Sequence, residues 1–321
     1  MDRRSFLMGA SLLAAGMRES FAQGFPSQPI RLVVGFTPGG ATDIIARFLA
    51  DALRPKLGSV IVENRPGATG MIAASYVARR PPDGYTLLFG SNGGMAIAAP
   101  NQEPPPFDSE KDFEPVAMTG AYDALLVANI DFPAKSIPEL VKLLKADPDK
   151  YQYAVSGLGG PIHLAGALFF REVGVKPTVV PYKGGGPALV DVQGGRVPLM
   201  MTSLGTIGNA IAEGKVRLLA SSGSRRMAQF PNTPTFAEAG YPGAVATFWN
   251  GVFAPAGTSP QVINKIADAI RETFADPAFR EKWEKTGGDA VTSTPAELRR
   301  ELASEIKKWK PVVTELGIRP S

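Results

Sequence analysis

The stretch VVGFTPGGATD, residues 33–43, joins the end of an apolar run, a glycine-rich turn and the start of a helical pattern. Glycine lets the backbone approach a ligand closely, and the first turn of a helix presents N–H groups without intrahelical partners. Those amides, together with the helix dipole, can bind an anion without lysine or arginine. Taken alone, the stretch fits a plain strand–helix turn capped by Thr42 or Asp43 equally well.

Two further junctions of the same kind follow later in the chain. SGLGGPIHLAG (156–166) comes after the apolar run YQYAV, and KGGGPALVDV (183–192) comes after TVVPY. Pro187 stands at a position that favours the first turn of a helix. Three such junctions can face one another across a cleft, and a two-headed anion with one carboxylate on each lobe fits that design.

Composition and charge narrow the function classes. The 321 residues are enough for two medium-sized domains, with 44% hydrophobic residues, 20% charged residues and a formal net charge of +4. Lysine and arginine are scattered, whereas nucleic-acid binding needs a concentrated basic face. The chain has no cysteine and one histidine, His163, which excludes disulfides, thiol catalysis and any site with two imidazoles. We expect no metal, no cofactor and no nucleic-acid partner.

Residues 1–22, MDRRSFLMGASLLAAGMRESFA, have the pattern of an export signal. Paired arginines precede a mildly apolar stretch that is too short, and too rich in glycine and alanine, to anchor the chain in a bilayer. A small-x-small sequence predicts cleavage between Ala22 and Gln23, and hence a periplasmic location. The R-R-x-F-L pattern favours twin-arginine export. Asp2 and Met8 depart from the usual form, so the general secretory route stays open as an alternative.

Short apolar runs alternate with helical patterns along the mature chain, which predicts parallel sheets covered by helices. Three helices are expected near the end, over 259–275, 277–286 and 295–316. The predicted strands are IRLVV (30–34), VIVE (60–63), TLLF (86–89), ALLVA (124–128), YQYAV (151–155), TVVPY (178–182), VPLMM (197–201) and VRLLA (216–220).

Two extended stretches, 116–129 and 245–257, are long enough to cross from one domain to another. Two crossings imply that the first domain is discontinuous. We place this domain at residues 23–122 and 250–321, and the second domain at residues 123–249. Two α/β lobes joined by two strands leave a cleft between them, which is the usual place for a ligand.

Nucleotide binding finds no support, since the pattern G-x-x-x-x-G-K-[ST] is absent and Ile162 stands where a dinucleotide loop needs its third glycine. A hydrolase that uses Ser156 and His163 is an alternative, although Ser156 does not lie in a G-x-S-x-G elbow. Phe36, Phe248 and Trp249 are the aromatic residues placed to line the cleft, and they fit equally well as hinge or core residues.

The sequence resembles the Bug (TctC) family, the extracytoplasmic solute receptors of tripartite tricarboxylate transporters. The resemblance covers nearly the whole mature chain and is carried by PIRLVVGFTPGGATDIIARFLADAL, VIVENRPGATGMIAASYVARRPPDGYTLLFGSNG, SGLGGPIHLAGALFF, VPYKGGGPALVDVQGGRV, PTFAEAGYPG and GVFAPAGTSPQVINKI. It implies a type II periplasmic-binding-protein fold with a hinge and an interdomain cleft, and no enzyme activity. It also implies a small carboxylate ligand (a di- or tricarboxylate or an aromatic acid) that is held largely by backbone amides and water.

The resemblance further implies membrane transporter subunits as partners, and we expect the receptor itself to be a monomer. A ligand-sensing module for a signalling partner is the alternative. The chain departs from the family pattern at Gly160-Pro161, where a serine or threonine is common, and MMTSLG (200–205) is a region expected to shape specificity. The ligand residues carried over are Phe36, Thr37, Gly39, Gly40, Ala41, Thr42, Asp43, Ser91, Asn92, Ser156, Gly157, Gly159, His163, Lys183, Gly184, Thr202 and Ser203, to which the second crossing adds Trp249.

Overall fold

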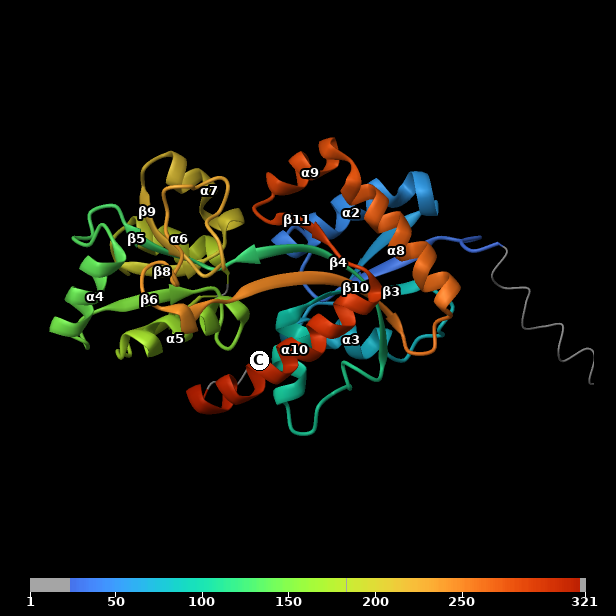
Figure 1. The fold of residues 1–321 in the computed structure, drawn as a ribbon, viewed down its shortest axis with the longest axis horizontal. Coiled ribbons are helices and arrows are strands. Elements are labelled where there is room, and N and C mark those ends of the chain that lie inside the picture. Colours follow the sequence, from blue (N-terminus) through green and yellow to red (C-terminus); the bar gives the residue numbers. More distant parts are fainter. Residues whose placement is uncertain (1–23, 183, 318–321) are drawn as a thin grey trace, which may run out of the picture.

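The structure, a computed structural model, describes residues 24–182 and 184–317. The predicted export signal, its cleavage site and Lys183 therefore lie outside the described residues. In the described part, the chain forms two α/β lobes, each built around its own sheet (Figure 1). No helix in that part is both long enough and apolar enough to cross a membrane.

The sheet of the first lobe has the strand order β11-β4-β10-β3-β1-β2. β1 pairs in parallel with β2 and β3, whereas β10 and β11 add antiparallel pairs around β4. Its strands are β1 (Ile30–Val34), β2 (Val60–Asn64), β3 (Thr86–Ser91), β4 (Phe113–Asp123), β10 (Thr247–Pro255) and β11 (Asp289–Thr292). The helical elements are α2 (Ala41–Leu57), η1 (Ala68–Gly70), α3 (Met71–Val77), the π-helical η2 (Gly93–Ala98), η3 (Ala99–Asn101), α8 (Pro260–Ala275), α9 (Pro277–Glu284) and α10 (Pro295–Leu316).

The sheet of the second lobe has the order β7-β6-β8-β5-β9, with β6 parallel to both neighbours and β5 antiparallel to both of its own. Its strands are β5 (Leu125–Asn129), β6 (Gln152–Val155), β7 (Thr178–Pro181), β8 (Leu199–Thr202) and β9 (Val216–Ser221). Its helices are α4 (Ile137–Ala146), α5 (Pro161–Val173), α6 (Gly185–Gln193), α7 (Leu204–Ala212) and the short η4 (Pro242–Ala244).

The eight predicted strands all form, within a few residues of their expected bounds. The last part of the chain needs one correction, because a strand, β11, stands between α9 and α10. β11 has only four residues and pairs with β4 alone at the edge of the sheet. So short an edge strand carries no run of alternating apolar residues that sequence reasoning could detect.

Two segments run between the lobes, the end of β4 into β5 and the start of β10 (Figure 1). Ser222, just after β9, ties them together: its Oγ accepts from the Ala124 amide at 2.9 Å, and its carbonyl accepts from the Ala246 amide at 2.8 Å. Thr247 Oγ1 also donates to the Asp123 carboxylate at 3.2 Å. The domain boundaries at 122/123 and 249/250 stay a prediction.

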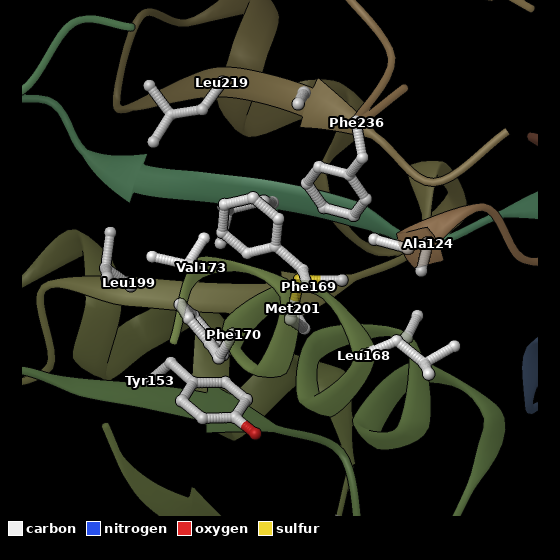
Figure 2. Close-up of a cluster of buried hydrophobic side chains, with 14 of the residues drawn as sticks. Ala124, Tyr153, Leu168, Phe169, Phe170, Val173, Leu199, Met201, Leu219 and Phe236 are labelled. Carbon is white, nitrogen blue, oxygen red and sulfur yellow. The ribbon is translucent and has the colours of Figure 1, made fainter. Parts of the chain in front are cut away.

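The core of the second lobe contains a cluster of aromatic rings among aliphatic side chains. Phe169 stacks on Phe236 with ring centroids 4.4 Å apart, and Phe170 packs on Tyr153 (Figure 2). α10, which leaves the first lobe, reaches this core, because Trp309 is fully buried in it and stacks on Phe248. The last helix therefore couples the two lobes through apolar packing.

Candidate ligand-binding site

A cavity of about 420 Å³ lies between the two lobes. Loops from both lobes line it, and so does the stretch of β4 that leads to the second lobe. Apart from His163, none of the described lining residues has an acidic or basic side chain. A cavity of this size suits a small organic ligand, and any anion in it must be held by dipoles and hydrogen bonds rather than by ion pairs.

The junction between β1 and α2 supplies the first group of donors. Ala41 and Thr42, the first two residues of α2, line the cavity. Gly40 is the N-cap in an extended conformation, and no described side chain caps the helix there. The N–H groups of this first turn therefore lack intrahelical partners, and the positive end of the helix dipole faces the cavity.

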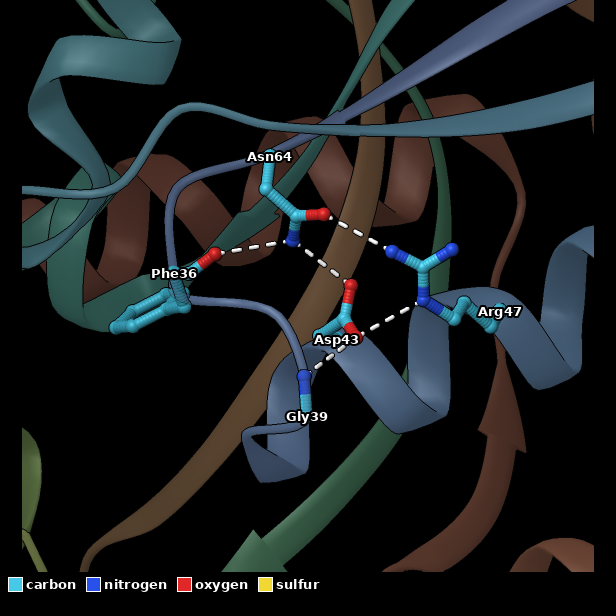
Figure 3. Close-up of polar contacts among 5 residues, drawn as sticks. All are labelled: Phe36, Gly39, Asp43, Arg47 and Asn64. Carbon is cyan, nitrogen blue, oxygen red and sulfur yellow. Dashed lines mark hydrogen bonds and ion pairs between the residues drawn. The ribbon is translucent and has the colours of Figure 1, made fainter.

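Asp43 supports this loop and does not line the cavity. Its side chain is 3% exposed and accepts hydrogen bonds from the Gly39 amide at 2.8 Å, Asn64 Nδ2 at 2.7 Å and Arg47 Nε at 2.9 Å (Figure 3). Burial alone would raise the pKa of Asp43, but these hydrogen bonds and the Arg47 charge outweigh it and lower the pKa to about 2. Asn64 also donates to the Phe36 carbonyl at 3.0 Å, so both ends of the turn are fixed.

The junction between β6 and α5 has a neutral support. Gly160 is an uncapped, extended N-cap, and Pro161 begins the helix. The Gly159 amide donates to Nδ1 of the buried His163 at 2.9 Å. An amide can only donate, so Nδ1 is unprotonated and the imidazole proton is on Nε2. Burial lowers the pKa of His163, which keeps the ring neutral. His163, which lines the cavity, can therefore offer it an N–H donor.

A third helix start comes from α7, not from the predicted junction before α6. Ser203 and Gly205, at the start of α7, line the cavity. Gly184, the N-cap of α6, does not. The segment 200–205, expected from sequence to shape specificity, thus contributes the helix start that closes this side of the site.

Eight of the predicted ligand residues lie together on the cavity wall: Phe36, Ala41, Thr42, Ser91, Ser156, Gly157, His163 and Ser203. Several of the others support the wall from behind. The Gly40 amide donates to the Thr37 carbonyl, and Asn92 is fully buried and donates to Glu305 of α10 at 3.2 Å. The predicted residues that do not line the cavity are Thr37, Gly39, Gly40, Asp43, Asn92, Gly159, Gly184, Thr202 and Trp249.

The alternation of side chains along β10 decides which way Trp249 points. Its side chain is buried in the first lobe, whereas the next residue of β10, Asn250, lines the cavity. Successive side chains of a strand point to opposite faces, so only one of these two can face the ligand. Sequence reasoning favoured the aromatic residue, and the strand places the amide there instead.

Sequence reasoning missed three parts of the wall. β4 contributes residues 119–122, and α9 and its connection to β11 contribute Trp283 and residues 286–288. Thr69 also lines the cavity and has a φ of 52°, in the left-handed region that a β-branched side chain rarely adopts. Such strain is often found at functional sites, but the residue type alone does not reveal it.

The two lobes touch beside the cavity. A Cβ on Gly93 of the first lobe would lie 2.7 Å from Cγ of Pro161 in the second. A Cβ on Gly287 would lie 2.7 Å from the amide nitrogen of Gly205. Glycine at these places allows the two lobes to approach more closely than a larger residue would permit.

The arrangement lacks the parts of a hydrolase. His163 Nδ1 already accepts from Gly159, and Nε2 carries the proton, so the ring offers no lone pair to activate Ser156. The described residues contain no group of three acidic or histidine side chains that could hold a metal ion. What the cavity offers is a set of hydrogen-bond donors around an apolar interior.

Two α/β lobes that enclose a ligand cavity between them define the class of periplasmic solute-binding proteins. Residues 45–318 match the family model described as "Tripartite tricarboxylate transporter family receptor" (TctC), and the chain belongs to this family. BugT of Bordetella pertussis is 36% identical over 99% of both chains. The family comprises solute-binding receptors, which are not enzymes.

Solved structures share the fold. The R. palustris protein Rpa4515 with adipate has a TM-score of 0.83 and is 34% identical, over 92% of this chain and 99% of its own. MatC from Rhodopseudomonas palustris with bound malate has a TM-score of 0.78 and is 32% identical, over 90% of this chain and 100% of its own. These are carboxylate complexes of relatives with the same two-lobe architecture.

Proposed function

We propose that this protein captures a small carboxylate between its lobes and delivers it to the membrane subunits of a tripartite tricarboxylate-type transporter. The observation that carries the proposal is the start of three helices, α2, α5 and α7, at a cavity without cationic side chains. Uncapped helix starts bind anions through backbone N–H groups and the helix dipole. The adipate and malate complexes of the two relatives support the same ligand class.

Lobe closure is part of this proposal. The lobes, with boundaries at 122/123 and 249/250, move about the two crossing segments, and the contact of Gly93 with Pro161 belongs to the closed state. A ligand shifts such an equilibrium only through contacts that it makes better in one state than in the other. Donors from both lobes provide them, because they converge on one anion only when the lobes are closed.

The ligand class is tested by thermal denaturation of the mature protein with a panel of aliphatic di- and tricarboxylates and aromatic acids. A ligand present at about 100 times its Kd adds about 2.7 kcal/mol to the free energy of unfolding. Native mass spectrometry of freshly purified protein identifies an acid that stays bound. If the matching amides and alcohols stabilise the protein as well as the acids do, the carboxylate proposal is wrong.

Delivery and export are tested separately. We infer that the receptor acts in the periplasm after removal of residues 1–22, through the twin-arginine route. Lysine at positions 3 and 4 together should then block export, whereas a general secretory signal tolerates the exchange. Co-purification with the transporter's membrane subunits should depend on the ligand. Co-purification with a sensor kinase instead would support the signalling alternative.

A further inference from the structure

The hydroxyl of Thr119 is a buried polar group without a partner in the wall of the cavity. Thr119 is fully buried in β4 and lines the cavity, and no described residue hydrogen-bonds to its Oγ1. Thr292 lies opposite it in β11, but the Thr292 hydroxyl is also without a partner in this part of the chain, so the two do not pair. A buried hydroxyl left unsatisfied destabilises a protein, which calls for a reason at this position.

The strand is built to hold Thr119 in this place. Trp249 pairs with Ala121 and Gly251 with Met118, so two residues of β4, Thr119 and Gly120, lie opposite the single residue between them on β10. This is a β-bulge, a feature that redirects side chains and is common beside functional sites. Gly120 has a φ of 104°, and a Cβ there would lie 2.8 Å from the Trp283 ring, so the bulge requires glycine.

The residue across from the bulge offers a second free polar group. Asn250 is 6% exposed and lines the cavity, and the described residues give its side-chain amide no hydrogen bond. A hydroxyl and a primary amide at one point of the wall can each donate and accept. The helix starts provide donors only. The side chains at the bulge can therefore both donate to and accept from a ligand, whereas the helix-start amides can only donate.

Two aspartates follow lining residues on this side of the cavity, and their charges disfavour a second carboxylate. Asp123 follows the lining residue Tyr122, and Asp289 follows Gly288. Burial raises the pKa of Asp123 to about 6, and the nearby Asp289 adds to the shift. Arg225 pairs with Asp289 at 3.4 Å, and neither its charge nor the hydrogen bond from Thr247 outweighs the effect of burial on the pKa of Asp123. An uncharged oxygen fits this end of the cavity better than an anionic one.

We propose that Thr119 and Asn250 determine specificity by binding a second, uncharged oxygen of the ligand, so that the preferred substrate is a hydroxy-substituted carboxylate. The inference rests on the proposed function, because the carboxylate of the same molecule occupies the helix starts. The ligand's oxygen satisfies both side chains in the closed state. The carbon skeleton between the two polar ends lies against Phe36, Ile45 and Trp283, which line the cavity.

The test measures binding by calorimetry to matched pairs of acids that differ by one hydroxyl: malate and succinate, 3-hydroxybutyrate and butyrate, 3-hydroxybenzoate and benzoate. The wild-type protein should prefer the hydroxylated member of at least one pair. Thr119→Val, which keeps the shape and removes the hydroxyl, should weaken binding of that member about ten-fold, as expected for one lost hydrogen bond, and leave its partner unchanged. Thr119→Ser should retain the preference.

Thr292→Val is the matched control, because it removes the neighbouring unpartnered hydroxyl outside the cavity wall. Both valine variants should raise the Tm of the ligand-free protein, but only Thr119→Val should alter the preference within a pair. Equal loss for both members, or no loss for either, would overturn the assignment of Thr119 while leaving carboxylate binding intact. Failure of the wild-type protein to bind any carboxylate would overturn both proposals.

Discussion

The glycine loops before α2 and α5 share a backbone plan and differ in what supports them. In the first lobe, a charged and buried carboxylate, Asp43, accepts from the Gly39 amide and is balanced by Arg47. In the second lobe, the neutral ring of His163 accepts from the Gly159 amide. In both loops the acceptor stands four residues after the amide, and in both the N-cap is an uncapped glycine.

This comparison shows that the side chains most suggestive of chemistry act here on the backbone. Asp43 and His163 each accept a hydrogen bond from a turn amide, of Gly39 and Gly159, and thereby fix the turn that precedes the helix start. A site organised in advance loses less entropy when the ligand binds. The cost of a buried charge falls only on the first lobe, where Arg47 and Asn64 offset it.

The largest effect is expected from an aspartate at either N-cap. Gly40 and Gly160 have extended backbones with φ of −74° and −79°, which any residue adopts. An aspartate side chain at either place would accept from the first-turn amides, stabilise the helix by about 1 kcal/mol and occupy the anion site. We expect Gly40→Asp and Gly160→Asp each to lower carboxylate affinity about 100-fold or more, measured by calorimetry, without loss of Tm.

The control for charge is asparagine at the same two positions, which caps the helix without a negative charge. Affinity should fall less than with aspartate. If Gly160→Asp abolished binding and Gly40→Asp did not, the anion would be held by the second lobe alone, and the equivalence of the two loops would fail.

Removal of the charged support should cost stability in the first lobe. For Asp43, a native pKa of about 2 against an ordinary value of 3.8 corresponds to about 2 kcal/mol. This contribution is present above pH 3.8 and is lost as the pH falls toward 2. Asp43→Asn should therefore lower the free energy of unfolding at pH 7 by about 2 kcal/mol, as measured by urea denaturation.

Asp51 provides a matched control on the same helix. Its side chain is 67% exposed and pairs with Arg54 at 3.2 Å, so Asp51→Asn should change the free energy of unfolding by less than about 0.5 kcal/mol. Equal effects of the two substitutions would mean that burial of Asp43 does not matter.

The contact between the lobes should respond to a single methyl group. The Cβ added by Gly93→Ala would lie 2.7 Å from Cγ of Pro161, and overpacking of this kind costs about 1–3 kcal/mol. In the proposed closure only the closed state contains the contact, so we expect ligand affinity to fall about ten-fold with little change in the stability of the ligand-free protein.

Gly186→Ala adds the same methyl group on α6, where nothing lies within 4 Å of the added Cβ. Calorimetry should show no change in affinity for this variant. Unchanged affinity of Gly93→Ala as well would place the Gly93–Pro161 contact outside the closure that the ligand drives.

The smallest effect is a pH dependence from the second lobe. The pKa of His163 is lowered by burial, so its native state resists protonation. Its contribution to stability is fully present above the unfolded pKa of about 6.5 and is lost as the pH falls through the lower native pKa. His163→Gln keeps an acceptor for the Gly159 amide but does not titrate. The fall in stability that His163 causes at low pH should therefore be absent from this variant.

The comparison of Tm between wild type and His163→Gln from pH 8 to pH 5.5 isolates this effect from other groups. Asp123 has a raised pKa, so its contribution makes Tm rise as the pH falls, and it does so equally in both proteins. If Tm depended on pH in the same way in wild type and His163→Gln, His163 would already be solvated or charged in the native state. The two loops would then not differ in having a neutral and a charged support.

How far the sequence could predict the site depends on which contacts are local. The turn, the glycine and the helix start are neighbours in the chain, so the loops at residues 36–43 and 156–163 could be found from residue patterns alone. The partner of Asn92 is Glu305, 213 residues away, and no local pattern indicates it. Trp249 and Asn250 differ only in strand parity, which depends on the register of β10 against β4.

By itself, the sequence determined the α/β class, and it predicted two crossings between lobes and an anion site at helix starts, because periodicity and glycine placement are local properties of the chain. Only the tertiary structure decided that Asp43 and His163 support amides, that α7 and not α6 completes the site, and that a bulge in β4 presents Thr119 to the cavity. These outcomes depend on which segments meet across the sheets and the cleft, and packing of distant segments is what fixes that.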